Sequence, residues 1–167
     1  MTTISREIEV NASKEDVWKA VSNFGDICKA SPGVTKSFVT SEQKEGIGAT
    51  RHCDFAMQGA SAEERITKWE NGESLSVEVY ELKKMPGVKT MSVDFVVRIE
   101  NDKTILRGDL HYSMKNVMFA AMNSIVVKKM NTQLWNSVIA GYKKHIETGD
   151  LVEKGTALEL DRVVTLN

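Results

Sequence analysis

The side chains that commonly act as nucleophiles or metal ligands are few in this sequence and widely spaced. The spacing of the two cysteines, Cys28 and Cys53, fits neither a metal knuckle nor a redox pair, so buried thiols are the favoured interpretation. The three histidines, His52, His111 and His145, fall on different predicted elements. No nucleophile elbow, phosphate-binding glycine loop or paired acidic motif accompanies them. The sequence thus gives no support to a hydrolase, kinase, redox enzyme or zinc protein, and we expect no cofactor.

The charge balance narrows the range of partners. Lys and Arg number 22 against 23 Asp and Glu, so the net charge is -1, and we expect neither nucleic acid nor an anionic membrane as a partner. No apolar run approaches the roughly 20 residues that span a bilayer, and the N-terminus lacks the apolar core of a signal peptide. We therefore expect a cytoplasmic protein without an integral membrane segment. The oligomeric state stays open, with a homodimer as one alternative.

Alternating and helical patterns predict the elements that must position any site. Apolar residues of one parity between Ile4 and Val10 predict a first strand, and Ser13 is a candidate N-cap for a short helix over residues 13–23. A second short helix would end before Pro32. Short turns between the later segments predict antiparallel neighbours. Six further strands are predicted at 34–41, 47–56, 62–70, 74–83, 88–100 and 103–114.

Apolar residues three or four apart follow Lys115 and predict one long helix. The predicted stripe consists of Phe119, Met122, Val126, Met130, Leu134, Val138 and Tyr142. Four lysines fall largely off this stripe and predict a solvated face: Lys128, Lys129, Lys143 and Lys144. Because Gly149-Asp150 ends the helix, we assign residues 1–148 to one domain and 149–167 to a C-terminal extension. The extension could be an extra edge strand, a partner-contacting arm or a loose tail.

Several segments resemble the SRPBCC superfamily, which includes START lipid-transfer domains, birch-pollen-type allergens and polyketide cyclases. Residues 10–21 resemble its first strand and the Asp-Val-Trp helix that follows, and residues 31–34 resemble its bend into the second strand. Residues 46–51 and 63–69 are similar to the "GxGxxR" and "ERI" segments of the polyketide cyclase/dehydrase branch. The resemblance implies an α+β helix-grip fold. In this fold a seven-stranded curved antiparallel sheet surrounds the long C-terminal helix, with two short helices after the first strand.

The resemblance also implies an internal cavity and its lining. It places Arg51, Cys53 and Phe55 on the inner face, and Glu64 and Ile66 beside them. An unpaired buried charge costs several kcal/mol, so we expect Arg51 and Glu64 to pair, either as a structural ion pair or as a ligand contact. The other predicted lining residues are Met57, Tyr80, Leu110, Tyr112, Phe119, Met122, Val126 and Met130. Core packing is the alternative for each apolar residue. The parity of residues 74–83 is ambiguous, and the resemblance favours Tyr80 over the apolar set.

Three functions fit this cavity. The first is binding or transport of a small, largely apolar ligand, such as a lipid, a polyketide or a hormone-like molecule, because that requires only the cavity. The second is a polyketide cyclase/aromatase-like enzyme in which Arg51, Glu64 and Tyr112 steer proton transfer, so the sequence leaves open whether the protein is an enzyme. The third is a regulatory protein-interaction module. Recognition of the plant-hormone-receptor type is not supported, because residues 57–61 depart from that subgroup's gate sequence.

Overall fold

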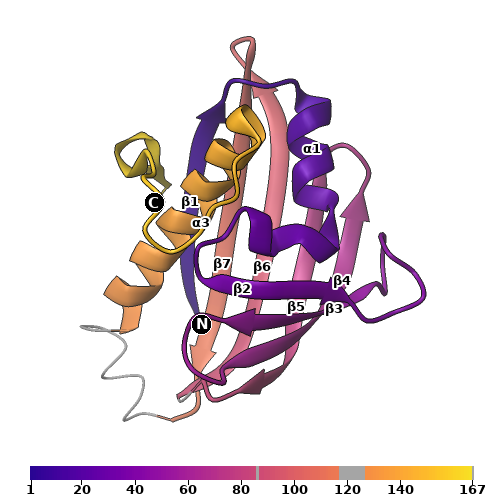
Figure 1. Ribbon diagram of the computed structural model, residues 1–167, viewed down its shortest axis with the longest axis vertical. Coiled ribbons are helices and arrows are strands. Elements are labelled where there is room, and N and C mark those ends of the chain that lie inside the picture. The colour runs from indigo at the N-terminus through magenta and orange to yellow at the C-terminus, as the bar shows by residue number, and fades with distance from the viewer. Residues whose placement is uncertain (86, 117–126, 167) are drawn as a thin grey trace.

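The computed structural model describes residues 1–85, 87–116 and 127–166. Its elements follow the predicted order of a strand, two short helical segments, six strands and a long C-terminal helix (Figure 1). In chain order they are β1 (Thr2–Val10), α1 (Lys14–Ser22), η1 (Phe24–Lys29), β2 (Val34–Val39), β3 (Thr50–Phe55), β4 (Ser61–Glu70), β5 (Ser74–Lys83), β6 (Val88–Glu100), β7 (Lys103–Met114), α3 (Lys128–Thr148), η3 (Leu160–Arg162) and β8 (Val164–Leu166).

The described strands form one antiparallel sheet in the order β2-β3-β4-β5-β6-β7-β1-β8. Consecutive strands from β2 to β7 are neighbours, as their short turns predicted. The α+β helix-grip fold is therefore confirmed. The sheet has one strand more than predicted because Val164–Leu166 of the C-terminal extension pair with β1. The extension thus supplies an edge strand, while the domain division at residue 148 stays a prediction.

Helices α1 and α3 lie on the same side of the sheet, which is its concave side (Figure 1). Ser13 caps α1, since its Oγ accepts a hydrogen bond from the Asp16 N–H at 3.0 Å. Along α3, Asn136 accepts a hydrogen bond from Arg6, and Glu147, near its C-terminal end, accepts one from Asn11. Helix α3 therefore runs parallel to β1 and antiparallel to β7.

Val138 and Tyr142 of the predicted stripe are buried, whereas in the first half of α3 the buried face is rotated by one position from that stripe. Met130 and Leu134 were expected on the inner face, but they are 60% and 45% exposed. Trp135 and Ile139 take the inner positions and press against Gly108 of β7. A Cβ atom at Gly108 would lie only 2.7 Å from Trp135 Cζ2 and 2.6 Å from Ile139 Cδ1. Because glycine permits this approach, the helix buries the larger apolar surface of Trp135 instead of that of Leu134.

Lys143 departs from its expected place on a solvated face. It is buried, and its Nζ donates a hydrogen bond to Glu147 Oε1 at 2.6 Å, one helical turn later. Lys128, Lys129 and Lys144 keep more exposed positions. The long stem of Lys143 therefore contributes to packing while its charge is neutralised by the neighbouring carboxylate.

Candidate ligand-binding site

Arg51 and Glu64 form a buried ion pair on the concave face. Arg51 lies on β3 directly opposite Glu64 on β4, so strand alternation sends both side chains to the same face. The Arg51 Nε and Nη2 atoms lie 2.7 and 2.5 Å from one carboxylate oxygen, Glu64 Oε2. The two residues are only 5% and 8% exposed. The structure thus contains the pairing predicted from the sequence.

A third nitrogen of the Arg51 guanidinium group reaches Phe24 of η1. Nη1 donates a hydrogen bond to the Phe24 carbonyl oxygen at 2.7 Å, and the guanidinium carbon lies 4.2 Å from the centre of the Phe24 ring. Burial acts to lower the pKa of Arg51, but the charge and hydrogen bond of Glu64 outweigh it, so the pKa is raised. Arg51 is therefore a fixed cation that joins η1 to the sheet.

Cys53 and Tyr142 lie close enough to this pair to respond to its charges. Burial raises the pKa of the Cys53 thiol to about 12, and the positive charge of Arg51 only partly opposes this. Burial likewise raises the pKa of the Tyr142 phenol to about 12. Both groups stay protonated at neutral pH, so they lie beside the pair as neutral polar groups and not as nucleophiles or bases. The sequence placed Tyr142 on the inner helix stripe but did not identify it as a neighbour of Arg51.

One half of the concave face, which we call the packed half, is filled. Its inner strand residues are buried against α3: Leu75, Val77, Phe95, Val97 and Leu106. Trp135 and Tyr142 close it from the helix, with ring centroids 5.7 and 5.5 Å from the centroid of Phe95. Ile66, opposite Val77, is fully buried beside them. The packing shows Ile66 as a core residue, and its predicted ligand contact stays a prediction.

The same strands continue towards the β3–β4 and β5–β6 turns into what we call the open half. Several of its inner side chains are apolar yet partly exposed: Phe55, Val79, Met91, Val93 and Met114. Val79 lies opposite Met91, so two of these side chains adjoin across the strands. Large apolar side chains at inward positions are usually buried, so this surface is suited to an apolar ligand. Phe55 was predicted from the sequence. The shared parity of Met91, Val93 and Phe95 was the signal that could have revealed the β6 residues.

Leu110 and Tyr112 lie on the inner face of β7, beside residues of the open half. Both are buried, with Tyr112 fully so. Leu110 lies opposite Val93 and Tyr112 opposite Met91, which places them at the inner edge of the open half. Their positions fit the predicted lining, and contact with a ligand stays a prediction.

Asn131 of α3 is a polar site residue that sequence reasoning missed. It is 7% exposed, and its Nδ2 atom finds no acceptor among the described residues. Because α3 is antiparallel to β7, Asn131 lies one turn from Trp135 towards the Met114 end of that strand. Buried amide groups almost always have a hydrogen-bond partner. This nitrogen is therefore a candidate donor to a bound molecule.

Tyr80 lies on the other face of the sheet, contrary to the expectation that it lines the cavity. The inner parity of β5 includes Val77 and Val79, and Val79 lies opposite Glu64. Tyr80 is 48% exposed, and the Arg65 guanidinium carbon lies 4.8 Å from the centre of its ring. Arg65 follows Glu64 on β4 and so points to the outer face. Burial of the apolar parity outweighed the partial polarity of tyrosine in setting this orientation.

The remaining predicted site residues are at the margin or outside the described chain. Met57 lies in the β3–β4 turn and is 49% exposed, so it borders the open half without being buried in it. Met130, on the exposed face of α3, does not line the concave side. Three further predicted lining residues, Phe119, Met122 and Val126, lie outside the described residues.

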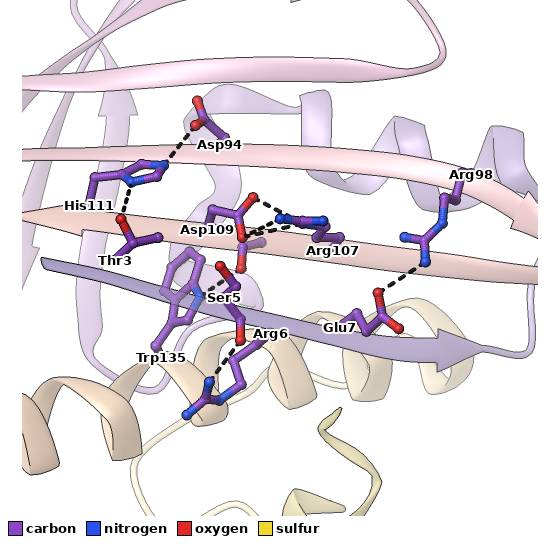
Figure 2. Close-up of polar contacts among 11 residues, drawn as sticks. Thr3, Ser5, Arg6, Glu7, Asp94, Arg98, Arg107, Asp109, His111 and Trp135 are labelled. Atoms are coloured by element: carbon purple, nitrogen blue, oxygen red, sulfur yellow. Dashed lines mark hydrogen bonds and ion pairs between the residues drawn. The ribbon is translucent and has the colours of Figure 1, made fainter. Parts of the chain in front are cut away.

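The histidines of the sheet, His52 and His111, lie on its outer face. His111 links three strands: Nδ1 lies 2.9 Å from Thr3 Oγ1, and Nε2 lies 2.9 Å from Asp94 Oδ2 (Figure 2). His52 contacts Glu63 and Asp54 in a similar way. Within the described residues, no group of three or more His, Cys, Asp or Glu side chains could hold a metal ion. No helix in that part of the chain is long and apolar enough to cross a membrane.

Comparisons with known proteins agree with this geometry. A family model described as polyketide cyclase/dehydrase and lipid transport matches residues 1–146. The chain belongs to this family. No curated protein sequence matches the chain. The superfamily resemblance drawn from the sequence is thereby confirmed.

Solved structures similar to this family member show the same fold. A protein from Thermus thermophilus is 14% identical, with a TM-score of 0.72 over 87% of this chain and 97% of its own. A START superfamily protein from Mycobacterium smegmatis is 17% identical, with a TM-score of 0.70 over 87% and 97%. A major latex-like protein from Panax ginseng is 13% identical, with a TM-score of 0.68 over 86% and 96%. At these identities the likeness concerns the fold alone.

Proposed function

We propose that the protein binds a small, largely apolar molecule in the open half of the concave face, between the sheet and α3. The observation that carries this proposal is the partial exposure of inward-facing apolar side chains such as Val79, Met91 and Val93. The same strands bury their inner residues completely in the packed half. Apolar surface that stays accessible inside a concave fold is the usual character of a ligand site.

The polar groups around the open half favour a mainly neutral ligand. Arg51 and Glu64 already neutralise each other, and burial keeps Cys53 protonated. Burying an additional charge beside them without a partner would be costly. Asn131 Nδ2 supplies a donor that a carbonyl, hydroxyl or ether oxygen of the ligand could accept. We therefore expect an apolar molecule that carries at least one hydrogen-bond acceptor.

A cyclase-like enzyme remains the second candidate, because the family description includes that activity. The geometry lends it less support. Three nitrogens of Arg51 are engaged by Glu64 and Phe24, which leaves the pair poorly placed to exchange protons with a substrate. If Glu64 nevertheless transferred a proton, Glu64→Gln should lower turnover by about 10²-fold or more while substrate still binds. A binding protein should show only a modest change in affinity.

The proposal is tested by filling the open half with a large side chain. Met91→Trp should lower the affinity for an apolar fluorescent probe, N-phenyl-1-naphthylamine, by at least about tenfold, because the indole occupies the binding space. Ser92→Trp is the matched control, since it adds the same ring to the opposite face of the same strand. The affinity of Ser92→Trp for the probe should stay within about threefold of that of the unmodified protein.

The proposed function would be wrong if the unmodified protein takes up no such probe. It would also be wrong if a folded Met91→Trp variant binds the probe as well as the Ser92→Trp control does. Circular dichroism and the unfolding midpoint establish that both variants are folded.

A further inference from the structure

Loops from distant parts of the sequence contact one another and form a rim along one side of the open half. Leu134 of α3 lies against Gly33, where a Cβ atom would be 2.9 Å from Leu134 Cδ1. The Gly33 carbonyl accepts a hydrogen bond from Ala56 at the start of the β3–β4 turn. A Cβ at Gly59 of that turn would lie 2.6 Å from Lys84 Nζ in the β5–β6 turn. The rim thus runs from α3 across the turn before β2 to the two sheet turns.

The β5–β6 turn connects in the same way to the end of β7. The Gly87 carbonyl accepts a hydrogen bond from the Lys115 N–H at 2.8 Å. Val88 lies opposite Met114, so the start of β6 and the end of β7 share this edge of the sheet. The rim therefore includes the last residues of β7.

This rim carries lysines and is poor in acidic residues. We call the following exposed residues the lysine rim: Lys83, Lys84, Lys89, Lys115, Lys128 and Lys129. The sequence contains no Asp or Glu in residues 82–93 or 110–146. Among the described residues, only Lys83 of this set has an acidic partner, Glu81 at 3.2 Å. The lysine rim is therefore a surface of mostly uncompensated positive charge.

Acidic side chains gather at the opposite ends of the same strands. In a meander of antiparallel strands, the β4–β5 and β6–β7 turns lie at the edge away from the β5–β6 turn. Glu70 and Glu73 flank the first of these turns, and Glu100 and Asp102 flank the second. Basic residues partly neutralise these carboxylates, since Lys68 pairs with Glu70 and Arg98 with Glu100, whereas the lysine rim has few acidic partners among the described residues. The expectation that an anionic membrane is not a partner rested on the net charge alone.

Exposed apolar side chains accompany the lysine rim. Met57 of the β3–β4 turn is 49% exposed, and Met130 and Leu134 of α3 are 60% and 45% exposed. These three side chains lie on two separate elements of the rim, close to its lysines in the chain or across the turns. Basic residues interspersed with exposed apolar side chains are typical of a surface that rests on the headgroups of an anionic bilayer.

From these observations we infer that the lysine rim docks the protein on an anionic lipid membrane, with the open half facing the bilayer. Charge complementarity supplies the attraction, and Met57, Met130 and Leu134 enter the headgroup region. An acidic protein surface could also attract the lysines. However, Met57, Met130 and Leu134 lie on separate elements, so one groove of such a partner would not accommodate all three. The inference concerns docking and is measured without any cargo in the open half.

The test is sedimentation of the full chain with lipid vesicles, using two triple variants. The rim variant carries Lys89→Glu, Lys115→Glu and Lys129→Glu. The control variant carries Lys19→Glu, Lys44→Glu and Lys154→Glu, three exposed lysines outside the rim that form no ion pair among the described residues. Each triple changes the net charge by the same amount, so the comparison isolates where the charge lies.

The unmodified protein should sediment with phosphatidylcholine vesicles containing about 30 mol% phosphatidylglycerol but not with phosphatidylcholine alone. Raising NaCl from about 0.05 to about 0.5 M should release it. Each lysine near an anionic surface contributes roughly fivefold in partitioning, so the rim variant should partition on the order of 100-fold less. The control variant should lose far less binding.

Two results would overturn the inference. One is equal loss of vesicle binding in both variants, which would trace binding to net charge. The other is the absence of vesicle binding by the unmodified protein. If the protein then binds soluble poly-glutamate in a manner that depends on the rim, its partner is an acidic protein and the membrane proposal is wrong. Probe uptake by the open half would be unaffected by either result, so the two proposals fail separately.

Discussion

The packed and open halves of the concave face share strands and alternation but differ in what covers them. In the packed half, Gly108 lets Trp135 and Ile139 approach the sheet closely, and Tyr142 packs against Phe95. In the open half several inner residues, such as Met91 and Val93, are equally apolar but keep partial contact with solvent, although Tyr112 beside them is buried. The difference shows that an alternating pattern specifies which side chains face inward. It does not specify whether other side chains pack against them. Stability is concentrated in one half, and we place ligand binding in the other.

The largest expected effect comes from a substitution that disrupts the packed half. Trp135→Ala removes a buried ring and its hydrogen bond to the Gly108 carbonyl, so the free energy of unfolding should fall by about 3–5 kcal/mol. Met91→Ala in the open half should cost only about 1 kcal/mol, because that side chain is already partly exposed. Urea unfolding followed by circular dichroism measures both. Equal losses in the two variants would show that the halves do not differ in packing.

The next effect concerns the ion pair beside the open half. Glu64→Leu leaves the Arg51 cation buried without its partner, so stability should fall by about 3 kcal/mol. Adding Arg51→Met removes that cation and should restore most of the loss, because an apolar pair replaces an ion pair of similar volume. Unfolding of the two single variants and the double variant forms a complete cycle. A double variant no more stable than Glu64→Leu would contradict the view that the pair is structural.

The smallest expected effect is a pH dependence of stability that arises from His52. This residue lies on the outer face of the sheet, away from both halves of the concave face. The hydrogen bond to Glu63, together with that to Asp54, raises the pKa of His52 above its usual value. A raised folded pKa stabilises the protein below the unfolded pKa of about 6.5, and this stabilisation is lost as pH rises through the folded value. Because the pair is near the surface, the loss between about pH 6 and pH 9 should stay below about 1 kcal/mol.

His52→Gln is the control for this prediction, because it keeps a polar side chain but cannot titrate. Its stability should lack the part of the pH dependence that His52 supplies. An unchanged pH profile in His52→Gln would assign the titration to another group.

Much of the fold followed from the sequence because it depends on local patterns. Parity placed Arg51 opposite Glu64, and turn residues placed the hairpins, since both signals act within a few residues. The rotation of α3 could not be predicted in this way. It depends on Gly108, which meets Trp135 only after the chain has folded, and Leu134 fitted the helical stripe as well as Trp135 did.

The site was harder to predict than the fold for the same reason. Tyr80 and Val79 have opposite parity on β5, and only burial against neighbouring strands decides which one faces inward. Asn131 carried no signal, because a lone asparagine near the start of a helix usually lies in solvent. The lysine rim was hidden by a net charge near zero, since its members are brought together from separate turns.

The location of a bound ligand is the most direct test of the account. Methyl NMR on a protein labelled at its methionine methyl groups can follow binding of a spin-labelled fatty acid, with signals assigned by Met→Leu substitutions. If the ligand enters the open half, the signals of Met91 and Met114 should broaden more than that of Met1, which is 92% exposed. Unchanged signals of Met91 and Met114 at saturating ligand would contradict the account.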